Sequence, residues 1–161
     1  EGLKIRVQQS NTSVRMVRVL GGSATPIDWG ELYSALQQGV VDGAENNPPS
    51  FFLSRHYEVC RYYILDEHTW VPDILLVSTH VWDGLTPLER EWLQEAADAS
   101  VMEQRRLWHA STQESLEAVR AAGVEIIEPD KEAFRQAAEP MFEDYRGTPT
   151  FELLRAIQEV R

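Results

Sequence analysis

The chain has 161 residues, of which 26 are acidic and 15 basic, so its formal net charge at neutral pH is −11. This balance argues against a nucleic-acid or anionic-membrane partner, because both are bound through basic patches. An apolar share of 43% with five tryptophans argues against disorder, and the length suits one domain or a large piece of a longer protein.

The opening residues, Glu1 to Lys4, lack the basic and apolar pattern of a secretory leader. No apolar run approaches the ~20 residues that span a membrane. The lone Cys60 cannot form an internal disulfide, and its neighbours predict a buried structural thiol. We therefore expect no leader, membrane span or disulfide within this sequence.

Three short strand patterns open the chain and alternate with helix patterns. Leu3–Val7 alternates apolar and basic side chains, as a half-buried strand does, and Ala24–Ile27 and Val40–Asp42 predict two more strands. The order over residues 3–46 is β-α-β-α-β, which is typical of a parallel sheet. The predicted fold class is therefore α/β, with a small, largely parallel sheet flanked by helices.

Two helices connect these strands, and a glycine ends each of them. Asn11 or Thr12 is expected to cap the first. Asp28 is expected to cap the second, with Glu31 at the capping-box position.

Helix patterns dominate the rest of the chain. Thr86-Pro87-Leu88-Glu89 predicts a capping box, and the helix it opens can run to Ala122, which is long for a globular domain. Asp130 is expected to cap a helix that is interrupted near Pro140. The other expected elements are a short helix from Pro48 to Arg55, strands at Tyr62–Leu65, Ile74–Ser78 and Val124–Ile127, and a terminal helix at Phe151–Val160 with Leu154 and Ile157 inward.

These patterns divide the chain into two parts. Residues 1–80 are expected to form the core of a ligand-binding lobe, and residues 81–161 a long helix with terminal helices. The long helix has more apolar surface than a small sheet can cover, so Trp82, Trp92 and Trp108 are candidates for burial against a surface outside this sequence. An uncovered surface of this kind can also drive self-association.

Arg6 is the first candidate site residue. It lies mid-strand between Ile5 and Val7, and a guanidinium suits a carboxylate held by two parallel hydrogen bonds. Because charge is screened beyond ~8 Å, one buried arginine can set the local sign of a site for an anionic small molecule. The alternative is an edge arginine paired with a surface acid.

Asn46 and Asn47 follow the third predicted strand, at the edge where open α/β sheets bind ligands. A carboxamide offers a donor and an acceptor, which suits sugar hydroxyls or a carboxylate. The alternative role is capping of the helix that starts at Pro48. We expect one of the pair to cap and the other to face the site.

Trp29, Gln8 and Ser10 complete this candidate region. The indole is a candidate platform for a sugar face, with simple packing as the alternative. Gln8 and Ser10 follow the Arg6 strand at the point where a ligand would lie, and the polarity of a loop is the other explanation.

Catalytic and metal sites have weaker support. Asp66 and Glu67 are adjacent, so their carboxylates would point to opposite faces of a strand, a poor arrangement for a glycosidase pair. The histidine spacing matches no metal motif, and the sequence has no nucleophile elbow or dinucleotide fingerprint. We expect no enzyme, metal or cofactor, and a ligand-facing or hinge role for Glu67 or His68.

An ordered series of motifs runs through the chain: Gly2-Leu-Lys-Ile-Arg-Val, Gly21-Gly-Ser-Ala-Thr-Pro26, Trp29-Gly-Glu-Leu-Tyr-Ser-Ala-Leu-Gln-Gln-Gly-Val-Val-Asp-Gly-Ala-Glu-Asn46 and His56-Tyr-Glu-Val, continuing to Ile126-Ile-Glu-Pro-Asp130. This series resembles the solute-binding proteins of tripartite ATP-independent periplasmic (TRAP) transporters. Such proteins are about twice as long, as two lobes require. The chain therefore resembles the C-terminal half, a periplasmic-binding-protein-like lobe whose long helix would pack on a first lobe outside this sequence.

The resemblance implies site roles for particular residues. Arg6 would clamp the carboxylate of the ligand, Asn46 would reach the ligand, and Trp29 would approach it. The residues implied to lie near the cleft are Gln8, Ser10 and His68. The Asn46-Asn47-Pro48 turn, with Ser54-Arg-His-Tyr57 and Asp66-Glu-His-Thr69, resembles the branch that takes sugar acids such as uronates.

The implied function is that of a periplasmic receptor, which captures an organic acid and delivers it to the TRAP membrane permease without chemistry on the ligand. Two alternatives come from other classes. One is a carbohydrate-active hydrolase that uses Glu45 or Glu67. The other is an interaction module that captures a partner through Trp92 and Trp108 of the long helix.

Overall fold

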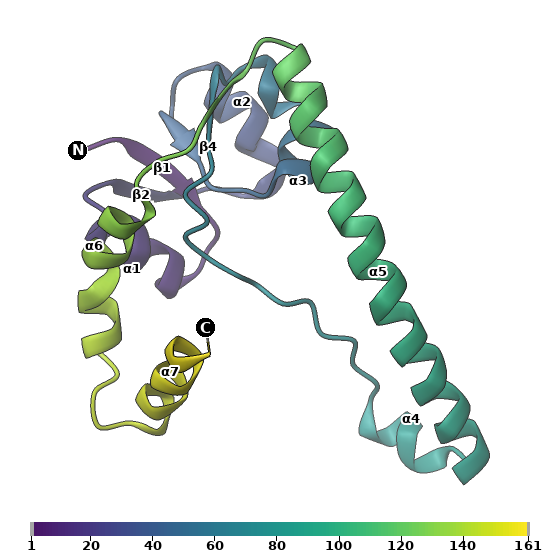
Figure 1. Ribbon diagram of the computed structural model, residues 1–161. Coiled ribbons are helices and arrows are strands. Elements are labelled where there is room, and N and C mark those ends of the chain that lie inside the picture. The colour runs from purple at the N-terminus through teal and green to yellow at the C-terminus, as the bar shows by residue number, and fades with distance from the viewer. Residues whose placement is uncertain (1, 161) are drawn as a thin grey trace.

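A computed structural model describes residues 2–160 and places two small parallel sheets beside one long helix (Figure 1). The first sheet has the strand order β2-β1-β3, in which β1 spans Lys4–Val7, β2 Ser23–Pro26 and β3 Gly43–Ala44. The second sheet pairs β4 (Tyr62–Ile64) with β5 (Glu125–Ile127). Both sheets are parallel, which confirms the predicted fold class.

The central strand β1 carries Arg6 into the middle of the first sheet. Arg6 pairs in register with Thr25 of β2 on one side and with Ala44 of β3 on the other. Its neighbour Val7 is fully buried. Arg6 itself is only 3% exposed, so its side chain is enclosed by the fold.

The helices around this sheet start differently from the prediction. Helix α1 spans Asn11–Val19, and Ser10 caps it by accepting a hydrogen bond from the Ser13 amide at 3.3 Å. Asn11 is already helical, so the expected cap at Asn11 or Thr12 is wrong by one or two residues.

The predicted capping box at Asp28 is also wrong. The residues after Asp28 form a 3-10 turn, η1 (Trp29–Glu31), and then α2 (Leu32–Gln37). The carboxylate of Asp28 makes no capping bond and instead accepts a hydrogen bond from Gln9 Nε2 at 3.0 Å. A tighter 3-10 turn moves the helical amides away from the carboxylate that would have capped them.

The third strand also lies later in the chain than predicted. Gly39 adopts a left-handed backbone with φ +69° and ends α2, as glycine does at helix ends. The next amide, of Val40, still bonds the Ala35 carbonyl at 2.9 Å, so Val40 belongs to the turn. The Asp42 amide bonds the Lys4 carbonyl of β1 at 2.8 Å, and the paired register starts at Gly43, which confirms a strand here but corrects its bounds from Val40–Asp42 to Gly43–Ala44.

Beyond the first sheet, α3 (Pro48–Leu53) and a 3-10 turn η2 (His56–Glu58) lead to β4. Phe51 of α3 forms a core cluster with Val119 and Val124, and the partly buried Cys60 packs against it. Burial raises the pKa of the Cys60 thiol, which suits the predicted structural role.

The expected strand at Ile74–Ser78 does not form. Residues 65–78 run as an irregular segment from β4 to α4 (Thr79–Gly84), with Trp70 92% exposed and Leu76 81% exposed. A strand needs a neighbour for its backbone hydrogen bonds, and within residues 2–160 this segment has none. Its apolar side chains lie uncovered in this chain.

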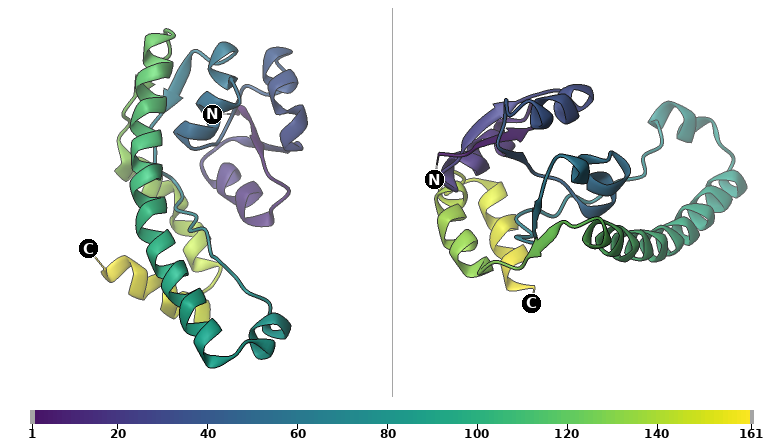
Figure 2. Two further views of the ribbon diagram at one scale, coloured as in Figure 1. Left: turned by 90° about the vertical axis from the view of Figure 1, so that its right-hand side faces the viewer. Right: turned by 90° about the horizontal axis from the view of Figure 1, so that it is seen from above.

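The long helix forms as predicted. α5 spans Pro87–Ala121, and Thr86 and Glu89 make the reciprocal capping box expected of them. Figure 2 shows α5 and α4 extending beyond both sheets in two further views. Trp92 and Trp108 are 58% and 46% exposed on this helix, whereas Trp82 is half-buried, with the Arg90 guanidinium carbon 5.5 Å from its ring centre. Burial of these tryptophans against a further surface stays a prediction.

Two helices complete the chain. α6 (Lys131–Glu143), capped by Asp130, packs on α1, where Arg15 pairs with Asp144 at 2.8 Å. The helix continues through Pro140 despite the lost amide donor, so the predicted interruption is wrong. α7 spans Pro149–Glu159 and leaves Ile157 exposed, contrary to the inward position expected.

The described residues contain no helix with the length and apolarity required for a membrane crossing.

Substitution of Leu32 tests the core of the first sheet. Its side chain is fully buried, so Leu32→Ala should lower the free energy of unfolding by about 2–5 kcal/mol through lost burial and a cavity. Leu53→Ala is the matched control, because Leu53 is 72% exposed and should change stability by no more than about 0.5 kcal/mol. Urea denaturation of both variants measures the difference, and equal losses would contradict the assigned core.

Candidate functional site

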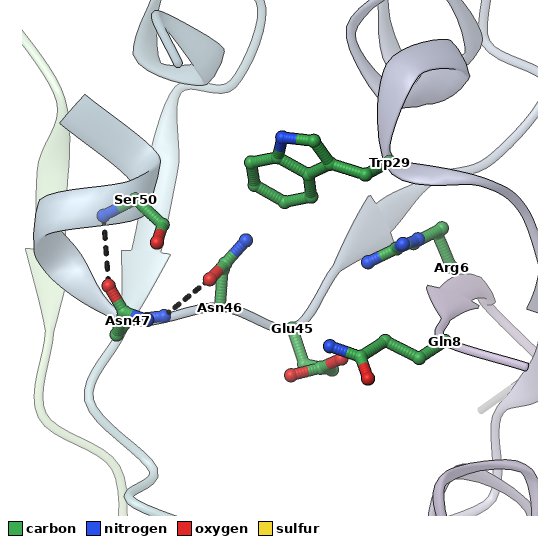
Figure 3. Close-up of a pocket in the computed structure, with 7 residues that line it drawn as sticks. All are labelled: Arg6, Gln8, Trp29, Glu45, Asn46, Asn47 and Ser50. Carbon is green, nitrogen blue, oxygen red and sulfur yellow. Dashed lines mark hydrogen bonds between the residues drawn. The ribbon is translucent and has the colours of Figure 1, made fainter. Parts of the chain in front are cut away.

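A pocket of about 260 Å³ opens beyond the carboxyl ends of β1 and β3. This is the edge at which ligands bind in open α/β sheets. Figure 3 shows the seven residues that line it: Arg6, Gln8, Trp29, Glu45, Asn46, Asn47 and Ser50. The structure thus brings together four of the predicted site residues, Arg6, Gln8, Trp29 and Asn46.

Arg6 is 3% exposed, and its Nε donates a hydrogen bond to the Ile27 carbonyl at 2.8 Å. That bond fixes one edge of the guanidinium and leaves its tip directed into the pocket (Figure 3). In the described part of the chain, no carboxylate lies within 4.0 Å of it. The alternative of an edge arginine paired with a surface acid is therefore wrong, and the buried charge is available to an anion.

Trp29 forms an aromatic wall beside this charge. The guanidinium carbon of Arg6 lies 5.7 Å from the centre of the indole, within the range of a cation–π contact. The buried ring of His56 meets the indole edge to face at 5.2 Å and supports it from behind. Burial, helped by the nearby Arg6 charge, lowers the pKa of His56, so this support is neutral at neutral pH.

Asn47 caps a helix and Asn46 faces the pocket, in line with the expectation of one role for each. The Oδ1 of Asn47 accepts the Ser50 amide at 2.9 Å and caps α3. The Oδ1 of Asn46 accepts the Asn47 amide at 2.9 Å, which leaves its side-chain NH₂ facing the pocket (Figure 3). Asn46 thus presents a hydrogen-bond donor to the pocket.

Glu45 is a pocket residue that we did not assign to the ligand site. Burial raises the pKa of its carboxyl, and the charges of His68 and Arg6 oppose that rise. Alternation of side chains along a strand would place Glu45 and Asn46 on opposite faces. The chain leaves β3 at Ala44 and turns, so both reach the pocket, and the Pro48 turn was the available signal.

Ser10 and His68 lie outside the pocket lining. Ser10 caps α1. The Nδ1 of His68 lies 2.8 Å from the Asp66 carboxylate, while its buried Nε2 has no partner among residues 2–160. Ligand contacts for both remain predictions.

Glu67 does not line this pocket. Its backbone is left-handed, with φ +48°, and its exposed carboxylate binds Lys131 at 2.5 Å. Glu45 is thus without Glu67 in the pocket lining, which does not favour the carboxylate pair of a hydrolase. Within residues 2–160, no group of three acidic, histidine or cysteine side chains is arranged to hold a metal ion.

The architecture and the site define a class of protein: a periplasmic-binding-protein-like lobe with a buried arginine at the ligand-binding edge of its sheet. Residues 1–148 match the family model described as bacterial extracellular solute-binding protein, family 7 (DctP), and the chain belongs to this family. The family consists of TRAP solute-binding proteins rather than enzymes, which also disfavours the hydrolase alternative.

Individual relatives are named as solute-binding proteins as well. A solute-binding protein of Chromohalobacter salexigens is 43% identical over 146 residues, which cover 90% of this chain and 44% of that protein. A structure of a TRAP periplasmic solute-binding protein from C. salexigens with bound D-glucuronate is 41% identical, with a TM-score of 0.94 over 100% of this chain and 55% of that one. Another from Xanthobacter autotrophicus, with bound β-D-galacturonate, is 43% identical, with a TM-score of 0.87 over 94% and 51% of the two chains.

The chain therefore spans about half the length of the relatives that it matches.

The Asp66–His68 pair gives a prediction about pH. The hydrogen bond that the Asp66 carboxylate accepts from the protonated His68 ring, aided by the charges of Asp66 and Glu45, raises the pKa of His68 above 6.5 despite desolvation. The pair therefore contributes stability that is fully present below pH 6.5 and is lost as pH rises through the folded-state pKa. Asp66→Asn should lower the pKa of His68 and remove this pH dependence.

NMR titration of the histidine rings, with thermal melts across the same pH range, makes the measurement. The pKa of His56 is an internal control, because its shift is caused by burial and Arg6 and should survive Asp66→Asn. An unchanged His68 titration in the variant would contradict the assigned pair.

Proposed function

We propose that the protein carrying this chain is the periplasmic receptor of a TRAP transporter and binds a sugar acid such as a uronate. The observation that carries the proposal is the buried Arg6 guanidinium, held by the Ile27 carbonyl and directed into the pocket without a carboxylate partner among the described residues. Relatives with bound D-glucuronate and β-D-galacturonate support the choice of ligand class.

The pocket chemistry suits a uronate. The carboxylate would pair with Arg6, and the Asn46 NH₂ would donate to a ring or hydroxyl oxygen. Gln8 and the Glu45 carboxylate would accept hydrogen bonds from sugar hydroxyls. The exposed indole of Trp29 would cover the apolar C–H face of the ring.

The rest of the receptor would complete the site. We assign residues 1–80 to the C-terminal ligand-binding lobe, and residues 81–161 to helices that bridge toward an N-terminal lobe. The uncovered side chains of Trp70, Leu76, Trp92 and Trp108 support this assignment, because they require a covering surface. Ligand binding would close the two lobes, and the closed form would deliver the acid to the membrane permease.

The arginine prediction tests this function directly. In the full-length protein, Arg6→Ala should abolish detectable uronate binding, because charged hydrogen bonds contribute about 1.5–3 kcal/mol each. Arg6→Lys keeps the charge but loses the two-pronged geometry, and should weaken affinity by at least about 10-fold. Thermal shift against a panel of uronates and dicarboxylates, followed by calorimetry, measures both effects.

Arg15→Ala is the matched control, since Arg15 is exposed and pairs with Asp144 away from the pocket. It should bind like the wild type. Undiminished uronate binding by Arg6→Ala would refute the proposal, and stabilisation by dicarboxylates alone would replace the ligand class.

Trp29 tests the sugar part of the ligand. Trp29→Ala should weaken a hexuronate by about 3- to 10-fold through loss of stacking area, and Trp29→Phe should recover most of that loss. A short aliphatic monocarboxylate has no ring to stack, so its affinity should change by less than about 2-fold. Calorimetry with both ligand types makes the comparison, and equal losses for the two would argue against the indole as a sugar platform.

A further inference from the structure

A side chain from the second sheet reaches the pocket loop, residues 45–50, which follows the last strand of the first sheet. The phenol of Tyr63, in β4, donates a hydrogen bond to the backbone carbonyl of Asn46 at 2.7 Å. Asn46 lines the pocket, whereas Tyr63 does not. This bond therefore joins the two sheets at the point where a ligand would meet an amide donor.

The phenol is itself held firmly. Its ring packs against the buried Phe51 with centroids 4.8 Å apart, and Phe51 belongs to the core cluster with Val119 of α5. Burial, together with the charge of Asp66, raises the pKa of Tyr63 far above its usual value, so the hydroxyl keeps its proton and remains a donor. The donor end of this bond is fixed to the long helix through the core.

The bond is the first of three hydrogen bonds that follow one another along the pocket loop. Tyr63 holds the Asn46 carbonyl, the Asn46 Oδ1 holds the Asn47 amide, and the Asn47 Oδ1 holds the Ser50 amide. With its carbonyl and its Oδ1 both engaged, Asn46 has its side-chain NH₂ left to face the pocket (Figure 3). The bond from Tyr63 restrains the backbone from which this carboxamide projects.

We infer that Tyr63 is a positioning residue for ligand binding, which orients the Asn46 carboxamide toward the pocket without touching the ligand. The inference deepens the proposed function and rests on it for the identity of the ligand. It also assigns the second sheet a role in the site, since β4 supplies the fixed point from which the amide donor is aimed.

A double-mutant cycle in the full-length protein tests the inference, with D-glucuronate and D-galacturonate as probes. Tyr63→Phe removes one oxygen and keeps the ring packing, and should weaken binding by about 3- to 10-fold. In an Asn46→Ala background the same substitution should weaken binding by less than about 2-fold, because the group that it positions is gone. Tyr63→Phe combined with Gln8→Ala should instead be additive.

Tyr62→Phe is the matched control, since it removes the same atom from the neighbouring, exposed residue of β4 and should leave affinity unchanged. A purely structural role of Tyr63 would lower the melting temperature and affect binding equally in every background. Additive effects of Tyr63→Phe and Asn46→Ala, or an unchanged affinity of Tyr63→Phe, would overturn the inference.

A ligand-free measurement separates this inference from the proposed function. Amide hydrogen exchange at Asn47 and Ser50 should be faster in Tyr63→Phe than in the wild type or in Tyr62→Phe, because the pocket loop loses its anchor. Absence of uronate binding in the wild type would defeat the proposed function, and the exchange rates alone would then decide the positioning role. Unchanged exchange at both amides would overturn it.

Discussion

Arg6 holds a positive charge inside the protein, and the neighbouring structure both fixes it and leaves it unneutralised. One edge of the guanidinium is bonded to the Ile27 carbonyl, and one face lies over Trp29. A buried charge without a counter-ion is costly, so an anion that enters the pocket recovers energy that the folded chain has already spent on desolvation. None of the described carboxylates lies within 4.0 Å of Arg6, which is why we propose an anionic ligand for this pocket.

The other pocket residues follow from this constraint. Glu45 is the nearest acidic lining residue, yet burial raises the pKa of its carboxyl while Arg6 and His68 oppose that rise. Its carboxyl group supplies a hydrogen-bond acceptor to the pocket and forms no ion pair with Arg6. Asn46 supplies a donor, and Trp29 supplies an apolar face. A molecule with one carboxylate, several hydroxyls and an apolar ring face matches this distribution of groups.

The sequence predicted most of this arrangement because the decisive signals were local. The capping box at Thr86, the alternation around Arg6 and the Asn–Asn–Pro turn each depend on a few neighbouring residues, and each formed close to its predicted place. The failures depend on more distant partners. The Ile74–Ser78 strand needed a neighbouring strand that residues 2–160 do not provide. The Asp28 carboxylate accepts a hydrogen bond from Gln9 and does not cap the helix that follows it. Glu45 could not be assigned because its direction depends on the turn after β3.

The loop of residues 45–50 has a consequence for how this protein could change during evolution. Asn47 starts α3, Asn46 locks the turn before it, and Tyr63 ties that turn to the other sheet. A substitution at Asn46 or Asn47 therefore alters the start of α3 as well as the lining of the pocket. Gln8 and Trp29 are exposed and carry no such second duty in backbone capping. Under the proposed function, new sugar preferences should arise first at those two positions, while the arginine and the loop are inherited unchanged.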